Sequence, residues 1–174
     1  ALEQGADVTI VSSDKDLMQL VRPGVVMFDA MKEKLIGPDQ VMEKFGVGPD
    51  KVIEVQALAG DASDNVPGVF GIGVKTAAEL INEYGDLETL LSRASEIKQP
   101  KRRQNLIDEA DAARVSRRLV TLMDDVPVEI DLSTFAVKEI KAETLLAFLV
   151  EQNFKSLIRT AEARFGVSVQ SGAP

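Results

Sequence analysis

The chain contains no cysteine, no histidine and no tryptophan among its 174 residues. Without cysteine there are no disulfides and no thiolate metal ligands. Without histidine there are no serine–histidine triads, imidazole zinc ligands or histidine general acids and bases. No apolar run approaches the length that spans a bilayer, and no basic-then-apolar signal pattern opens the chain. Any catalysis must therefore depend on Asp, Glu, Lys, Tyr or a bound metal.

Positive charge is in short supply, since the net charge is −8. That balance argues against a nonspecific DNA-binding protein, although carboxylates that ligate a metal would be partly neutralised. The charge is uneven, and we name the stretch Lys98–Arg118 the basic island. A solvated face is the usual outcome for such a run, and a secondary phosphate contact is the alternative. Its seven basic residues are Lys98, Lys101, Arg102, Arg103, Arg114, Arg117 and Arg118.

The first part of the chain predicts strands. Val8–Val11 is a continuous β-branched run typical of a buried parallel strand, and short strands are expected at residues 25–28 and 34–36. We therefore expect an α/β remnant with a few strands of a parallel sheet at residues 1–37. A few strands cannot form a doubly wound sheet with both faces covered.

The rest of the chain is predicted to be mainly α-helical, over residues 38–167, with a small polar linker at residues 168–174. Asp86 is expected to cap the helix that follows it, and Gly85 to end the helix before it. Helices are predicted at residues 38–45, 50–58, 75–84, 87–93, 102–122, 142–152 and 155–165.

Asp14 and Asp16 directly follow the strand at residues 8–11. Ligands of open α/β sheets bind beyond the carboxyl ends of the strands. Two carboxylates that point to one side repel each other unless a cation or a proton joins them. Divalent metal binding is one interpretation. A solvated loop, with Asp14 as the N-cap of the next turn, is the other.

Asp61 and Asp64 follow the apolar helix predicted at residues 50–58. Their spacing of three places both on one helical face. A carboxylate near a helix C-terminus opposes the helix dipole, which suggests a use beyond the helix itself. Metal binding and capping of the next turn both remain open for this pair.

The segment between Val66 and Lys75 is a glycine-rich hairpin that leads into a helix. Glycines permit positive φ and let a phosphate approach the backbone, while amides at the helix start and a lysine attract the anion. The spacing does not match a nucleotide P-loop. A plain helix-turn-helix with glycine caps is the alternative. The candidate phosphate contacts are Gly68, Val69, Gly71, Ile72, Gly73, Lys75 and Thr76.

Taken together, these motifs resemble the 5′-nuclease (flap endonuclease) domain of bacterial DNA polymerase I. The resemblance lies in SSDKDLMQL after a strand, ALAGDASDNVPGVFGIGVKTAAELI, RRLVTLMDDVPVEID and EQNFKSLI, and covers nearly the whole chain. Family members commonly have proline where Phe70 stands. The resemblance implies a helix-hairpin-helix near residues 60–84 and a bacterial cytoplasmic protein of replication and repair.

The resemblance also implies the chemistry. In this family, clustered carboxylates bind two Mg²⁺ or Mn²⁺ ions that cut the 5′ strand of DNA near a flap, nick or RNA primer. Asp14 and Asp16 match one ligand pair and Asp61 and Asp64 match the other. The hairpin matches the element that grips duplex DNA, often with K⁺ on main-chain carbonyls, and Lys75 matches a phosphate-contacting lysine.

The family's early strands and arch have no counterpart in this chain. We therefore expect the C-terminal part of the domain, joined in cis to further polymerase domains, which binds DNA but does not cut it alone. A non-catalytic helix-hairpin-helix module for duplex DNA is the alternative, with the aspartates as caps. A helical protein-interaction domain ranks last, because it needs no glycine-rich hairpin.

Overall fold

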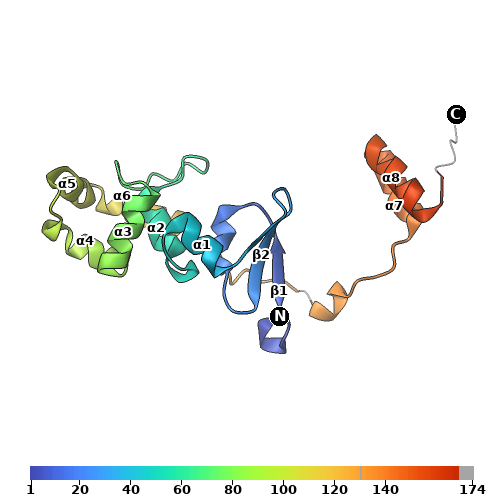
Figure 1. Cartoon of the computed structure of the whole chain (residues 1–174), viewed down its shortest axis with the longest axis horizontal. Helices are drawn as coiled ribbons and strands as arrows, with labels where there is room; N and C mark the ends of the chain where they lie inside the picture. Colours follow the sequence, from blue (N-terminus) through green and yellow to red (C-terminus); the bar gives the residue numbers. More distant parts are fainter. Residues whose placement is uncertain (130, 169–174) are drawn as a thin grey trace. The chain divides into compact units, whose positions relative to one another are not determined.

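The computed structural model describes residues 1–129 and 131–168 (Figure 1). The chain divides into two compact units, Ala1–Pro127 and Val128–Pro174. The predicted linker lies outside the described residues except for residue 168. None of the helices in the described ranges combines the length and the apolar character that a membrane span requires.

A three-stranded sheet opens the first unit, with β1 at Val8–Val11, β2 at Val25–Asp29 and β3 at Lys34–Ile36. The strand order is β1-β2-β3. β1 and β2 are parallel, as predicted, but β1 is not the buried strand that was expected, because Thr9 and Val11 are exposed. β3 runs antiparallel to β2. The prediction of a parallel sheet is therefore wrong for β3. Only residues 30–33 join β2 to β3, which is too short for a parallel crossover.

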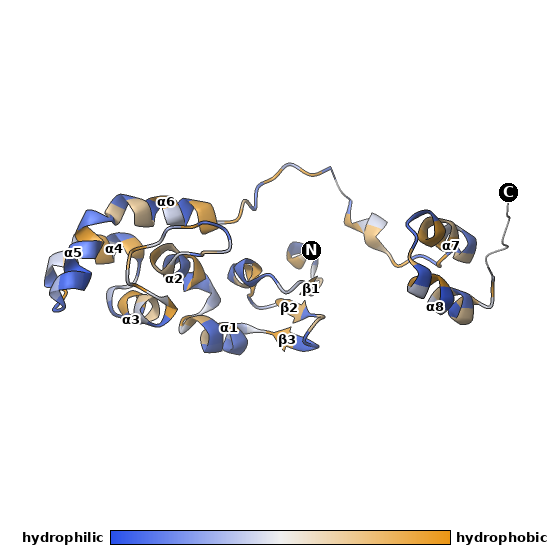
Figure 2. Cartoon of the chain, turned by 90° about the horizontal axis from the view of Figure 1, so that it is seen from above, coloured by the Kyte–Doolittle hydropathy of each residue, from blue (hydrophilic) through white to orange (hydrophobic). Residues whose placement is uncertain are grey.

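The helical region follows the sheet and begins with α1, Pro38–Phe45. The next helix, α2 (Val52–Ala59), lies at its centre and is apolar on nearly all sides, as expected of a fully buried helix. Figure 2 shows the apolar residues of α2 and of α3 (Val74–Tyr84) among the neighbouring helices. Val52, Val55, Ala57 and Leu58 are completely buried in α2. The α-helices of the first unit are α1 (Pro38–Phe45), α2 (Val52–Ala59), α3 (Val74–Tyr84), α4 (Leu87–Ser92), α5 (Pro100–Asp108) and α6 (Ala110–Val120).

Short 3-10 helices connect these elements. The one that matters most for function is η2, Lys15–Leu20, which directly follows β1. The others are η1 (Leu2–Gln4), η3 (Pro49–Lys51), η4 (Ala94–Glu96) and, in the second unit, η5 (Leu132–Phe135).

The single helix predicted at residues 102–122 is wrong, because the structure has two helices there. α5 ends at Asp108 and α6 begins at Ala110. Glu109 leaves helical geometry with φ −109° and ψ 18°. Its carboxylate accepts a hydrogen bond of 2.6 Å from the Phe70 amide. A long-range contact therefore accompanies the break, and helical periodicity carries no sign of it.

The second unit contains a helical pair, α7 (Ala142–Glu151) and α8 (Lys155–Phe165). Both agree with the predicted ranges within one residue. Leu146, Leu149 and Ala161 form their small buried core. This core is separate from the large core of the first unit.

Candidate functional site

Three carboxylates from two separate segments of the first unit converge. Asp16 lies in η2, and Asp61 and Asp64 lie in the loop after α2. Each offers a carboxylate oxygen, and these oxygens all lie within 4.8 Å of one another. Asp61 is buried at 9% exposure, while Asp64 is exposed. We name Asp16, Asp61 and Asp64 the acidic cluster.

Asp14, the fourth predicted ligand, has a different contact. Its Oδ1 accepts a hydrogen bond of 3.0 Å from the Asp16 amide, so Asp14 is the N-cap of η2. Its own amide donates to the Ser12 hydroxyl. The geometry of Asp14 therefore agrees with the capping alternative. Its role as a metal ligand stays a prediction.

Asp61 and Asp64 lie in a turn and not on a helical face, so that expectation is wrong. α2 ends at Ala59, and Gly60 follows with φ 70°. Asp61 and Val66 then exchange two backbone hydrogen bonds of 2.8 and 2.9 Å, which close the turn. The turn still brings Asp64 beside Asp61, because the backbone pairing of Asp61 with Val66 folds the segment back on itself.

Lys15 supplies the positive charge of the acidic cluster. Its ammonium pairs with Asp61 Oδ2, while Asp61 Oδ1 accepts hydrogen bonds from the Ser63 amide and hydroxyl. Lys15 and then Ser63 lower the pKa of Asp61 to about 2, against the opposing effect of burial. The contact with Asp61 likewise raises the pKa of Lys15. Asp61 is therefore ionised at neutral pH, which is the form that binds a metal.

Gln56 is a residue of the site that the sequence analysis missed. It lies in α2, is 2% exposed, and its amide Nε2 donates to Asp16 Oδ1. Its Oε1 is buried and has no hydrogen-bond partner. A buried polar atom without a partner is costly unless another group completes it. Two polar residues, Glu54 and Gln56, in an otherwise apolar helix were the signal that could have revealed it.

The donor atoms of the acidic cluster are all oxygens. Carboxylate oxygens suit hard cations such as Mg²⁺, Mn²⁺ or Ca²⁺ better than soft ones. The three carboxylates, whose oxygens lie within 4.8 Å of one another, fit such an ion. Within the described residues, no other set of three or more acidic side chains has this geometry.

The predicted hairpin joins α2 to α3 and depends on close backbone packing. Gly68 has φ 63°, and a Cβ added there would lie 2.5 Å from the Gly60 nitrogen. Its amide donates to the buried Ser116 hydroxyl of α6 at 2.9 Å. The side chains of Val69 and Ile72 are buried, so these two residues offer their backbone alone to a ligand.

The tip of the hairpin is held by α5 and by the α5–α6 junction. Besides the bond from the Phe70 amide to Glu109, the Asn105 amide donates to the Phe70 carbonyl at 2.8 Å. The Phe70 ring is 69% exposed, and the Lys101 ammonium lies 5.8 Å from its centroid. An aromatic ring and a cation thus share the exposed tip.

The start of α3 presents free backbone amides. The first hydrogen bond into the helix is donated by Ala77 to Gly73, so the amides of Val74, Lys75 and Thr76 are those that an α-helix leaves unpaired. Lys75 is exposed and Thr76 is half-buried. The arrangement suits an anion at the end of the hairpin.

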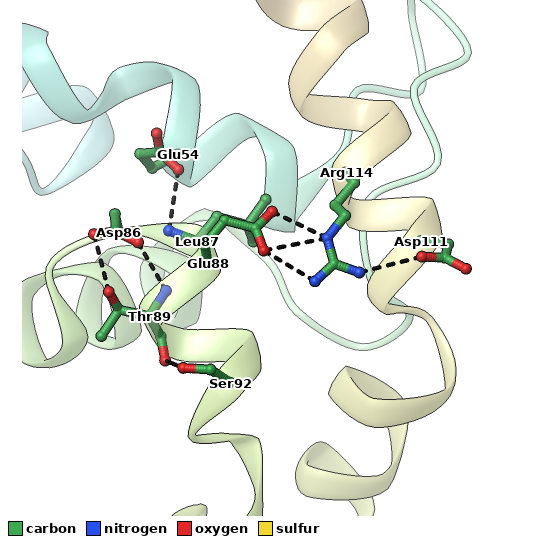
Figure 3. Close-up of polar contacts among 8 residues, drawn as sticks. All are labelled: Glu54, Asp86, Leu87, Glu88, Thr89, Ser92, Asp111 and Arg114. Carbon is green, nitrogen blue, oxygen red and sulfur yellow. Dashed lines mark hydrogen bonds and ion pairs between the residues drawn. The ribbon is translucent and has the colours of Figure 1, made fainter.

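The structure divides the basic island into two groups. Arg114 pairs with Glu88 and Asp111, Arg117 pairs with Glu54, and Arg103 donates to the Ile97 carbonyl. Figure 3 shows how Arg114 bridges α6 to Glu88 of α4, while Glu54 of α2 accepts from the Leu87 amide. These arginines join helices. Within the described residues, Lys98, Lys101, Arg102 and Arg118 form no ion pair.

Comparison with protein families gives a match over the central part of the chain. The model of the family described as 5′-3′ exonuclease, C-terminal SAM fold, matches residues 47–143. DNA polymerase I of Rhizobium leguminosarum is 56% identical over 160 residues, which are 91% of this chain and 16% of that protein. DNA polymerase I of Bacillus subtilis is 33% identical over 162 residues, which are 91% of this chain and 18% of that protein. The chain thus spans less than a fifth of these relatives.

Solved structures show the same fold. The 5′-exonuclease of bacteriophage T5 is 26% identical with a TM-score of 0.61, over 66% of this chain and 47% of that one. The T5 flap endonuclease in a pseudo-enzyme–product complex with DNA and metal ions is 25% identical with a TM-score of 0.61, over 66% of this chain and 42% of that one. The catalytic core of Rad2, in complex with DNA substrate, is 16% identical with a TM-score of 0.56, over 87% of this chain and 54% of that one. At that identity, Rad2 shares the fold alone.

Proposed function

Because the chain belongs to the 5′-3′ exonuclease family with the C-terminal SAM fold, we propose that it is part of a metal-dependent 5′-3′ exonuclease and flap endonuclease of DNA polymerase I. The observation that carries the proposal is the acidic cluster beside a hairpin of close-packed glycines. Metal-assisted hydrolysis of a phosphodiester in duplex DNA requires the metal beside the scissile phosphate and a surface that binds the duplex backbone. In this assignment, residues 1–37 belong to the nuclease core and residues 38–167 to its helical C-terminal part.

The acidic cluster would hold Mg²⁺ or Mn²⁺, with Asp14 as a further ligand of the two-ion site. Such a pair of ions supplies an activated water and stabilises the charge on the phosphate oxygens. Asp61 is held ionised by its neighbours, and Gln56 fixes the orientation of the Asp16 carboxylate. The relative from bacteriophage T5 that carries DNA and metal ions supports this role.

α2, the hairpin and α3 would form a helix-hairpin-helix that binds the duplex backbone. The amides at the start of α3 and the Lys75 ammonium would contact a backbone phosphate, together with Gly68, Gly71, Gly73 and Thr76. Main-chain carbonyls of the hairpin would hold K⁺. The Phe70 carbonyl already accepts the Asn105 amide, so it keeps one lone pair for the ion. Lys101 extends the positive charge past the tip.

The test is cleavage of a 5′-flap duplex with Mg²⁺, by this chain and by a chain extended to the full nuclease domain. We expect the extended chain to cut, and Asp16→Asn or Asp61→Asn in it to abolish cutting while duplex binding persists. This chain alone is expected to bind the duplex without cutting. An extended chain that cuts equally well with both substitutions would contradict the metal role of the acidic cluster.

A second candidate function is a non-catalytic module for duplex DNA. The N-cap role of Asp14 favours it, since one predicted ligand already has a structural use. Such a module would bind the duplex equally well in EDTA. Removing a negative charge with Asp61→Ala would leave the affinity unchanged or raise it, because repulsion from the phosphates falls.

A further inference from the structure

The acidic cluster carries its own cation. Lys15 is the first residue of η2, and its ammonium pairs with Asp61 Oδ2 and lies 3.5 Å from the Ser63 hydroxyl. The side chain of Lys15 is 33% exposed, whereas that of Asp61 is 7% exposed. The ammonium therefore reaches into the cluster from the solvent side while the carboxylate is fixed inside.

Three carboxylates at this separation repel one another in the absence of a cation. Within the described residues, Lys15 is the one basic side chain that pairs with the cluster. Its charge also acts on Asp16 and Asp64. Lys15 thus keeps the three carboxylates together when no metal is bound.

We propose that Lys15 is a built-in competitor of the metal, which occupies Asp61 in the metal-free protein and leaves when a divalent cation enters. The proposal rests on the metal site proposed above. Mg²⁺ binds carboxylate oxygens directly, at about 2.0–2.1 Å. A divalent ion at that distance repels an ammonium that is paired with the same carboxylate. A lysine side chain is flexible and strongly hydrated, so Lys15 can move out into water.

The proposal predicts an unusual direction of effect. Removing a residue from a binding site normally weakens binding. Lys15→Gln instead removes the competitor. The metal-free state loses the positive charge that balances its carboxylates, so the affinity for the metal rises. We expect the chain to bind Mn²⁺ about threefold to fivefold more tightly, the upper part of the range of an exposed ion pair.

The measurement is Mn²⁺ binding to this chain by isothermal titration calorimetry, without DNA. Lys15→Arg keeps the charge and is expected to restore the affinity to within about twofold of the original chain. Lys34→Gln is the matched control, because Lys34 is an exposed lysine paired with Glu43 and not with the cluster. Its removal should leave the affinity unchanged. Circular dichroism checks that each variant is folded.

Each outcome decides between the two proposals. If Lys15→Gln binds Mn²⁺ more tightly, and adding Asp64→Asn removes that gain in affinity, the proposal that Lys15 competes with the metal is supported. If the original chain binds Mn²⁺ and Lys15→Gln binds it equally or less tightly, the competitor proposal is wrong. The proposed metal site would still stand. Absence of Mn²⁺ binding in both the original chain and Lys15→Gln overturns both.

Discussion

At the scale of single residues, two of the candidate functional positions are also positions that the fold constrains. Asp61 combines burial with an ion pair, and Gly68 combines positive φ with a backbone contact. In both cases one side chain, or the lack of one, determines the local structure. Each leads to a measurable consequence.

Asp61 should give the metal-free chain an acid-sensitive step in stability. Its pKa falls from 3.8 in the unfolded chain to about 2 in the folded chain. Its contribution to the free energy of unfolding is therefore complete above the unfolded-state pKa and is lost as the pH drops through the folded-state pKa. We expect a loss of about 1–2 kcal/mol between about pH 4 and pH 2. Urea unfolding in EDTA measures it. Asp61→Asn should flatten this step, and an unchanged step in that variant would assign it to other groups.

Gly68→Ala should disrupt the hairpin. The added Cβ would lie within 2.5–2.8 Å of backbone atoms of Ala59 and Gly60, and the residue would keep a positive φ. We expect a loss of more than about 2 kcal/mol in the free energy of unfolding. Gly73→Ala is the control, because no heavy atom lies within 4 Å of its added Cβ and its φ is −93°. Similar losses in both variants would contradict the argument from close packing.

At the scale of elements, the hairpin depends on helices that follow it by tens of residues. Ser116 of α6 accepts a hydrogen bond from the Gly68 amide. Glu109 accepts from the Phe70 amide, and Asn105 donates to the Phe70 carbonyl. The arginines of the basic island join α6 to α2 and α4. The second half of the first unit therefore sets the shape of the candidate DNA-binding element.

Ser116→Ala tests this dependence. The substitution leaves the buried Gly68 amide without a partner, which costs about 1–3 kcal/mol. We expect faster hydrogen exchange at Gly68 and Val69 and weaker binding of duplex DNA. Ser92→Ala removes an exposed hydroxyl with a local hydrogen bond and should change neither measurement. Unchanged exchange at Gly68 in Ser116→Ala would show that α6 does not hold the hairpin.

The helical pattern predicted most helices, and its failure at Glu109 has a long-range origin. Residues 38–45, 75–84 and 155–165 have caps and apolar faces that are visible locally, and the structure has helices there. The antiparallel β3 follows from the short connection after β2, which is a local feature. The break at Glu109, in contrast, coincides with a hydrogen bond from Phe70. Local propensity cannot encode a partner that lies 39 residues away.

At the scale of the whole molecule, the chain has two separate cores. The large core gathers residues between Met18 and Ala113, and the small one lies between α7 and α8. All residues of the acidic cluster and the hairpin belong to the first unit. The candidate site should therefore not require the second unit.

A chain that ends at Pro127 tests this independence. Because its core is complete within the first unit, we expect it to unfold cooperatively, at a Tm within a few degrees of that of the first unit in the full chain. Mn²⁺ and duplex affinities should also persist. Thermal circular dichroism and the same binding titrations measure both. A large loss of Mn²⁺ affinity would mean that the second unit contributes to the site.

The amino-acid sequence by itself determined the chemistry that this protein can use. The absence of histidine and cysteine left Asp, Glu, Lys, Tyr or a bound metal for any catalysis, and the glycines and the aspartate pairs marked the candidate segments. These properties are local, so they can be read from residue types and spacing. The tertiary structure alone decided which groups meet: Asp16 with Asp61 and Asp64, Lys15 with Asp61, and Gln56 with Asp16. Those contacts follow from the packing of η2 against α2, which no local pattern contains.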